Sequence, residues 1–377
     1  MRIPFNIPYL SGNESIYVKN AINNLNTTNS ASYTDKCRTF IKTKWNFNEL
    51  FLTNSCSAAL EVCALLLDIK PGDEIIVPSY TFTSTANAFI RQGATIVFAD
   101  TQKNHPGIDE NTIESLINEK TKAIIPVHYA GVACDMDEIM KIAEKHDLYV
   151  IEDAALAFDG YYRSKPLGGI GHLGCLSFNQ TKNLQCEEGG AILINENRFI
   201  KKAQNILEKG TNRNEFLTGK VERYEWVEVG SSFLMTELHA AYLYAQLENA
   251  EWIKERRVSL WNLYYKSLKI LLEKRLLGLP LVPQYAEHNA HTFYIVLDNS
   301  KMLTDLKSYM EEKDIQTAVH YSSLDQSIYW KRDHSSSLKN PESLRFNNCL
   351  LRLPLYNSMT IEEVDYVTSS LLSYFNI

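Results

Sequence analysis

The chain has 377 residues, 45% of them hydrophobic and 22% charged, which is ordinary for a globular protein with a large core and two domains. Its formal charge of −7, without a long basic run, disfavours nucleic acid as a partner. The seven scattered cysteines include no CxxC pair, so we expect neither structural disulfides nor a metal site. No stretch approaches the ~18 apolar residues of a membrane span, and the first residues contain no apolar segment long enough for a signal peptide. We therefore expect a cytoplasmic protein without a membrane partner.

From about residue 50 to 210, short apolar runs alternate with helical patterns. The expected strands are 50–52, 74–77, 95–99, 123–127, 148–151, 174–178 and 191–194. The expected helices are 58–67, 86–91, 110–119 and 136–145. Because strands that alternate with helices need crossover connections, this order predicts an α/β fold with a mostly parallel central sheet, covered on both faces.

The pattern changes after Met235. A long connecting helix is expected over 236–272, leading into a smaller α/β domain. That domain is expected to hold strands at 291–297 and 317–321 and helices at 301–312 and 360–375. We therefore predict a large domain at 1–250 and a small C-terminal domain at 251–377.

Two charged residues follow strands of the predicted sheet. Lys182 lies just past the strand 174–178, and Asp153 follows the strand 148–151. This pair suits pyridoxal 5′-phosphate (PLP), because a lysine amine forms a Schiff base with it and an aspartate pairs with its pyridine nitrogen. Taken singly, most such residues are an ordinary surface lysine and a strand-end acid, so the interpretation depends on their neighbours.

Other residues suited to the same cofactor follow neighbouring strands. The small residues at 53–58 join a strand to a helix, where free helix amides and the hydroxyls of Ser55 and Ser57 suit a phosphate. Serine and asparagine are also ordinary helix caps, which is the alternative. Phe82 is placed to stack on a flat ring, although aromatics near sheet edges are more often core. Ser177 ends its strand within reach of the same phosphate.

Together these residues resemble the DegT/DnrJ/StrS sugar-nucleotide aminotransferases, which are fold type I PLP-dependent transferases. The resemblance covers nearly the whole chain, at 55–60, 71–74, 78–82, 126–131, 152–155, 177–183 and 188–190. It implies a homodimer with shared active sites, which uses glutamate and a nucleotide-linked keto-sugar as substrates.

The resemblance also implies individual roles. Lys182 is the catalytic residue that carries the cofactor, Asp153 faces the ring nitrogen, and Phe82 stacks on the ring. The phosphate ligands are Cys56, Ser57, Ser177 and, from the partner chain, Ser232. His320 and Tyr321 match a family position that faces the active-site cleft, so both are expected to bind the substrate. Independently of the resemblance, Arg213 lies with Lys209 in a locally basic turn that suits the substrate diphosphate. A structural histidine and a solvated charged loop are the respective alternatives.

A narrower resemblance points to one branch of this family. Segments 3–6, 127–133, 208–213, 230–235 and 289–294 are similar to the TDP-4-amino-4,6-dideoxygalactose transaminases, which aminate carbon 4 of TDP-4-keto-6-deoxyglucose with glutamate. That activity implies a role in cell-surface polysaccharide biosynthesis, such as that of the lipopolysaccharide O-antigen.

Two positions depart from the family pattern. Leu156 stands where a glutamine is usual and Asn179 where a histidine is usual, so we expect a lower cofactor affinity or rate. Three alternatives remain: an aminotransferase acting on another keto-sugar nucleotide, a PLP-dependent sugar dehydratase, or a non-catalytic binding protein. Lys182 disfavours the dehydratase, because those enzymes carry histidine there, whereas Leu156 and Asn179 give some weight to the binding protein.

Overall fold

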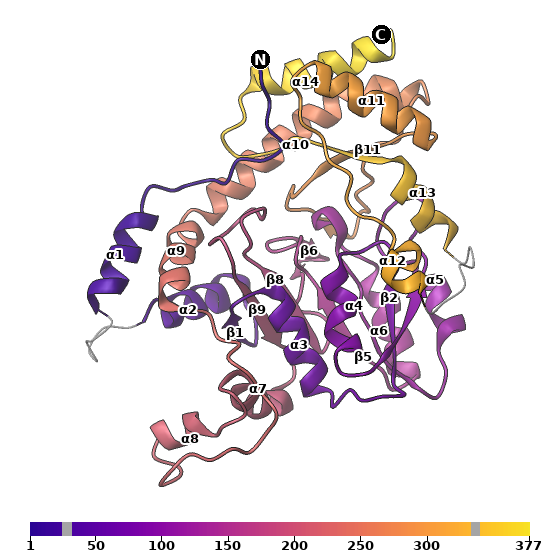
Figure 1. Cartoon of the computed structure of the whole chain (residues 1–377). Helices are drawn as coiled ribbons and strands as arrows, with labels where there is room; N and C mark the ends of the chain where they lie inside the picture. The colour runs from indigo at the N-terminus through magenta and orange to yellow at the C-terminus, as the bar shows by residue number, and fades with distance from the viewer. Residues whose placement is uncertain (25–31, 333–339) are drawn as a thin grey trace.

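The computed structural model describes residues 1–24, 32–332 and 340–377. Its centre is a seven-stranded sheet with the order β1-β9-β8-β5-β4-β2-β3 (Figure 1). The strands are β1 (Glu49–Thr53), β2 (Glu74–Pro78), β3 (Thr95–Ala99), β4 (Thr121–Ile124), β5 (Tyr149–Asp153), β8 (Leu173–Ser177) and β9 (Gly190–Ile194). β9 is antiparallel to both of its neighbours, and the other pairings are parallel. The predicted mostly parallel α/β sheet is therefore confirmed.

Helices cover both faces of this sheet. One face carries α3 (Cys56–Leu66), α4 (Thr83–Ile90) and α7 (Ile200–Leu207). The other carries α2 (Tyr33–Trp45), α6 (Met136–Lys145) and α9 (Glu237–Leu247), with α1 (Glu14–Asn24) against α9. Successive strand residues enter different cores, as Ile192 and Leu193 do, because side chains alternate across a strand. Burial on both faces explains why these strands are almost wholly apolar.

The C-terminal part of the chain surrounds a two-stranded antiparallel sheet. β11 (Phe293–Val296) pairs with β12 (Leu350–Leu353), among α10 (Ala250–Glu273), α11 (Ser300–Glu312), α13 (Pro341–Cys349) and α14 (Ile361–Tyr374). Ile3 of the N-terminal arm bridges to Ile315 and joins this separate core. The boundary at residue 250 stays a prediction.

The remaining described α-helices and strands are short. They are α5 (Glu110–Ile113), α8 (Arg213–Leu217), α12 (Ile328–Lys331), β6 (Tyr161–Tyr162), β7 (Lys165–Pro166) and β10 (Ala286–Glu287). The helix expected over 110–119 is thus a single turn that continues as a 3-10 turn at Glu114–Leu116. Within the described ranges, no helix is both long and apolar enough to cross a membrane.

Two other predicted elements are wrong. The helix expected over 236–272 is two helices, because Asn249 leaves the helical conformation and its side chain bonds the carbonyl of Ala245 (3.0 Å). The segment 317–321 forms no strand, and only Ala318 bridges to Arg352. The carbonyl of His320 instead accepts hydrogen bonds from two tyrosine hydroxyls, which draws the segment away from the sheet.

Candidate active site

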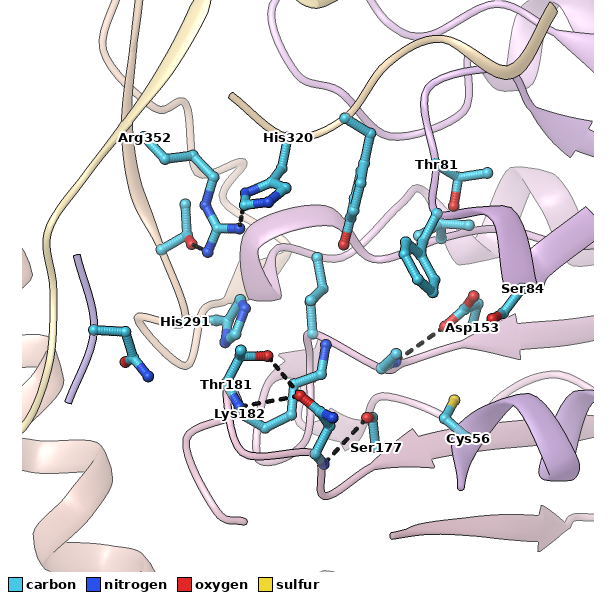
Figure 2. A pocket seen from close by; sticks show the side chains of 18 of the residues that line it. Cys56, Thr81, Ser84, Asp153, Ser177, Thr181, Lys182, His291, His320 and Arg352 are labelled. Atoms are coloured by element: carbon cyan, nitrogen blue, oxygen red, sulfur yellow. Dashed lines mark hydrogen bonds between the residues drawn. The ribbon is translucent and has the colours of Figure 1, made fainter. Parts of the chain in front are cut away.

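A cavity of about 390 Å³ opens where the parallel strands end, between the large sheet and the C-terminal part (Figure 2). Parallel strands place their carboxyl ends at one edge of a sheet, so the segments after β1, β2, β5 and β8 all reach it. The N-terminal arm contributes Phe5 and Asn6, and the C-terminal part contributes His291, His320 and Arg352.

Asp153 ends β5 and lies buried at the wall of this cavity. Its Oδ2 accepts a hydrogen bond from the Thr85 hydroxyl (2.7 Å), and its Oδ1 accepts one from the backbone N–H of Ala155 (3.1 Å). Thr81 adds a second hydroxyl, 3.0 Å from that of Thr85. Because both oxygens are held, the carboxylate has a fixed direction, which fits a protonated pyridine nitrogen.

Lys182 reaches the same cavity from the turn after β8. Its backbone N–H donates to the carbonyl of Asn179 (2.8 Å), and the Asn179 side chain accepts from the N–H (3.2 Å) and the hydroxyl (3.1 Å) of Thr181. Burial lowers the pKa of Lys182 to about 8, and the Arg352 charge acts in the same direction. About a tenth of the amine is therefore unprotonated and nucleophilic at pH 7.

The first turn of α3 presents unused donors to this cavity. Ser55 is the helix cap, since its hydroxyl accepts from the N–H of Ala58 (3.1 Å). The amides of Cys56 and Ser57 come next and have no partner within the helix. The Ser57 hydroxyl lies 2.6 Å from that of Ser84, and Ser177 also lines the cavity. This set of donors at a helix N-terminus fits the phosphate of PLP.

Besides Phe5, the rings of Phe82 and Tyr321 border the cavity. The side chain of Phe82 is 54% exposed, and its ring centroid lies 5.9 Å from that of Tyr321. An exposed ring beside buried polar groups leaves a face on which a flat cofactor can stack. Burial raises the pKa of Tyr321, so its hydroxyl stays protonated at neutral pH.

His320 contacts an arginine that the sequence analysis did not identify. Arg352 donates through Nη1 to His320 Nδ1 (3.1 Å) and through Nη2 to the Thr292 hydroxyl. Burial and the Arg352 charge lower the pKa of His320 to about 4, so the ring is neutral and its proton lies on Nε2. The signal for Arg352 was one charged residue in the apolar run 350–355. Nothing in the sequence marked Thr85 or Ser84.

Three predicted residues do not line this cavity: Ser232, Arg213 and Lys209. Ser232 is exposed, and its carbonyl accepts from Asn54 Nδ2 (3.1 Å). Arg213 pairs with Glu208 (3.2 Å) at the start of α8, which projects from the body of the molecule (Figure 1). Their roles stay predictions, and each requires the cavity of a second subunit.

The two departures from the family pattern both border the cavity. Leu156 packs in an apolar cluster with Tyr80 and Tyr129. Asn179 donates to Glu188 Oε1 (2.8 Å) and so orders the turn that carries Lys182. A lower cofactor affinity or rate stays a prediction for both.

Known proteins resemble this chain in sequence over most of its length. The model of the DegT/DnrJ/EryC1/StrS aminotransferase family matches residues 12–372. SpsC of Bacillus subtilis, a spore coat polysaccharide biosynthesis protein, is 33% identical over 327 residues, or 83% of this chain and 82% of its own.

Solved structures share the fold. The PLP form of Spr1654 from Streptococcus pneumoniae is 24% identical, covers 100% of both chains and has a TM-score of 0.89. Helicobacter pylori PseC, an aminotransferase involved in the biosynthesis of pseudoaminic acid, is 24% identical with the same coverage and a TM-score of 0.88. The fold is that of the fold type I PLP-dependent enzymes.

Proposed function

This chain belongs to the DegT/DnrJ/EryC1/StrS aminotransferase family, and we propose that it moves an amino group from glutamate to a nucleotide-linked 4-keto-6-deoxy sugar. PLP is the cofactor of this family, and the cavity residues fit it. The proposed reaction converts TDP-4-keto-6-deoxyglucose to TDP-4-amino-4,6-dideoxygalactose, in the cytoplasm, for a cell-surface polysaccharide. The names of SpsC and PseC support a sugar substrate. They do not indicate which carbon is aminated, so amination at carbon 4 depends on the resemblance to the TDP-4-amino-4,6-dideoxygalactose transaminases.

One observation carries the proposal: Lys182 and Asp153 line the same cavity as the free amides of α3 (Figure 2). An amine, a carboxylate and an anion site in one cavity match the aldehyde, ring nitrogen and phosphate of PLP. Any one of them alone has an ordinary structural explanation. Their convergence favours the aminotransferase over a non-catalytic binding protein.

The chain's own residues divide the work as follows. Bound PLP withdraws electrons from the substrate carbon that carries the nitrogen, so a proton on that carbon becomes acidic. Asp153 favours the protonated ring nitrogen on which this withdrawal depends. Lys182 Nζ takes the proton from glutamate in the first half-reaction and delivers one to the sugar carbon in the second. The neutral His320 offers its Nε2–H to a sugar hydroxyl.

The proposal includes a homodimer with shared active sites. The segment around Ser232 carries exposed apolar side chains, among them Trp226 (81%), Val229 (61%) and Leu217 (64%). Several large apolar side chains exposed in one segment support a protein interface. Ser232 and Arg213 then act in the partner's cavity.

The test is incubation of the holoenzyme with glutamate and TDP-4-keto-6-deoxyglucose, with the UDP sugar in parallel. We expect the mass of the amino sugar and small proton couplings at carbon 4, which identify the galacto configuration. A deoxygenated product indicates the dehydratase instead. A protein that retains no PLP and converts neither sugar supports the binding protein.

A further inference from the structure

Arg352 brings a positive charge without a counter-ion into the active-site cavity. A guanidinium has five N–H donors, and the described contacts engage two, with the neutral His320 ring and the Thr292 hydroxyl. Its Nε is buried and has no hydrogen-bond partner among the residues that the structure describes. No carboxylate in those same ranges lies within 4.0 Å of the group. A partly buried charge with a buried, unpaired Nε is costly unless a ligand supplies the missing hydrogen bonds.

Arg257, the other arginine of the cavity wall, shows what a structural arginine looks like here. Its donors are taken by the carbonyls of Ala290 (3.1 Å), His291 (2.8 Å) and Leu355 (3.2 Å). These bonds fix the segments that carry His291 and end β12. Arg352 makes no such set of bonds, so stability of the fold does not account for its unused donors.

The missing partner is an anion that lies close to the reacting centre. The amides of α3, which would bind the cofactor phosphate, lie on the side of the cavity opposite to Arg352 (Figure 2). Arg352 instead shares its side with His291 and is near enough to Lys182 to influence the amine electrostatically. An amino acid that reacts beside Lys182 carries carboxylates within a few bonds of the reacting carbon. The planar guanidinium matches a carboxylate through two parallel hydrogen bonds.

We propose that Arg352 binds a carboxylate of the amino-acid donor, and that Thr292, His320 and the ring of Phe5 hold its guanidinium in place. The guanidinium carbon lies 5.2 Å from the Phe5 ring centroid, so the N-terminal arm packs against the group. This inference rests on the proposed aminotransferase function. It adds a donor-binding residue to the assignments that the resemblance supplied.

The test measures the first half-reaction alone, on holoenzyme mixed rapidly with glutamate. The change in cofactor absorbance gives the donor's Kd and the limiting rate. Replacing Arg352 by glutamine removes about 10- to 100-fold of glutamate affinity, the usual size of a lost hydrogen-bonded charge. Arg352→Lys keeps the charge and should lose less glutamate affinity than Arg352→Gln. Arg345→Gln, which removes a charge outside the cavity, changes nothing.

Two modified donors identify the carboxylate. If Arg352 binds the α-carboxylate, the α-amide of glutamate reacts equally poorly with the wild type and Arg352→Gln. If it binds the side-chain carboxylate, glutamine instead reacts equally poorly with the wild type and with Arg352→Gln. Either result supports the inference. Wild-type glutamate affinity in Arg352→Gln overturns it.

Thymidine diphosphate, titrated by calorimetry, tests the competing anion. We expect its affinity to stay within about twofold in Arg352→Gln. A selective loss of diphosphate affinity overturns the inference and assigns Arg352 to the nucleotide.

A wild type that reacts with glutamate but aminates no sugar nucleotide refutes only the proposed acceptor. A wild type that binds neither glutamate nor 2-oxoglutarate overturns the proposed function and the inference together. Circular dichroism and cofactor retention check that Arg352→Gln folds.

Discussion

Burial gives Lys182 the chemical properties that the proposed reaction needs, and its replacement by alanine tests them. Lys182→Ala removes the only side chain that we assign to proton transfer at the substrate carbon. We expect turnover to fall about 10³-fold or more, with little change in the thermal unfolding midpoint. Borohydride reduction followed by mass spectrometry should find the cofactor attached to the wild type and not to the variant. Lys201→Ala, which removes a surface ion pair with Glu215, is the control. Wild-type turnover by Lys182→Ala would refute the assignment.

The lowered pKa of Lys182 predicts how cofactor capture depends on pH. Only the unprotonated amine attacks an aldehyde, and burial moves the pKa of this group from 10.5 to about 8. The rate at which apoprotein attaches added PLP should therefore rise with pH and level off above about 8. An exposed lysine would still be gaining rate near pH 10. Stopped-flow absorbance measured from pH 6 to pH 10 gives the midpoint of this rise in rate. The range covers about two pH units on either side of the expected pKa.

Sequence and structure differ in what they reveal about individual residues. Lys182 and Asp153 were predictable, because each follows an apolar strand and carries a chemically distinctive group. Thr85 was not, since a threonine within a helix has no sequence signal and its role comes from the approach of α4 to β5. Arg352 did stand out as one charged residue in an apolar run, but its role depends on packing that the sequence does not show. Its strand belongs to the other part of the chain, and the cavity exists only after the two parts pack together.

At the scale of elements, β9 approaches the start of α3 closely at Gly190. A substitution at Gly190 therefore tests whether the start of α3 binds the cofactor phosphate. A Cβ at Gly190 would lie 2.5 Å from the backbone nitrogen of Cys56, which is too close for the start of α3 to remain in place. We expect Gly190→Ala to cost about 1–3 kcal/mol of unfolding free energy, as overpacking usually does, and to weaken PLP binding.

Gly278→Ala is the matched control for that substitution. Its added methyl would meet Val296 Cβ at 3.4 Å, an ordinary contact, so stability and PLP affinity should be close to those of the wild type. Denaturant titration gives the first quantity and cofactor titration the second. Equal PLP affinity in the two variants would show that the start of α3 does not hold the phosphate.

Elements with a long, regular pattern were predicted best. The helix expected over 136–145 is α6 with the same bounds, because Asp135 caps it and its apolar face is periodic. The failures at 236–272 and 317–321 have different causes, one local and one remote in sequence. Asn249 interrupts a helical pattern through one side-chain bond, and His320 is held by Tyr80 and Tyr129, which are remote in sequence. Only the bonds to His320 lack a local signature, because the tyrosines that make them lie far away in the sequence.

At the scale of the whole molecule, the alternation of strands and helices predicted a parallel sheet but not the order of its strands. β1 is the first strand in sequence and lies at one edge beside the antiparallel β9. This placement brings the start of α3 next to β8 and Lys182, and it could be found only in three dimensions. The projecting segment with α8 and Ser232 belongs to this scale as well, because its exposed apolar residues find no cover within the described part of one chain.

Subunit mixing tests whether Ser232 completes the partner's site. In a shared site, Lys182→Ala damages the subunit that carries it, whereas Ser232→Trp damages the cavity opposite. Each variant alone should be inactive. A heterodimer of the two keeps one intact site, formed by the Lys182 of one subunit and the Ser232 of the other. Unfolding and refolding an equal mixture should therefore restore about a quarter of wild-type activity, because half of the dimers are mixed.

A second mixture provides the control for that experiment. Lys182→Ala with Asp153→Asn damages both subunits on the same side of the site, so no pairing restores it and activity should stay absent. Recovery in the first mixture but not in the second requires a dimer in which the segment around Ser232 crosses to the neighbouring cavity. Full activity of Ser232→Trp alone would remove Ser232 from the site. If both variants are inactive and their mixture is too, Ser232 acts within its own chain, which its exposure outside the cavity argues against.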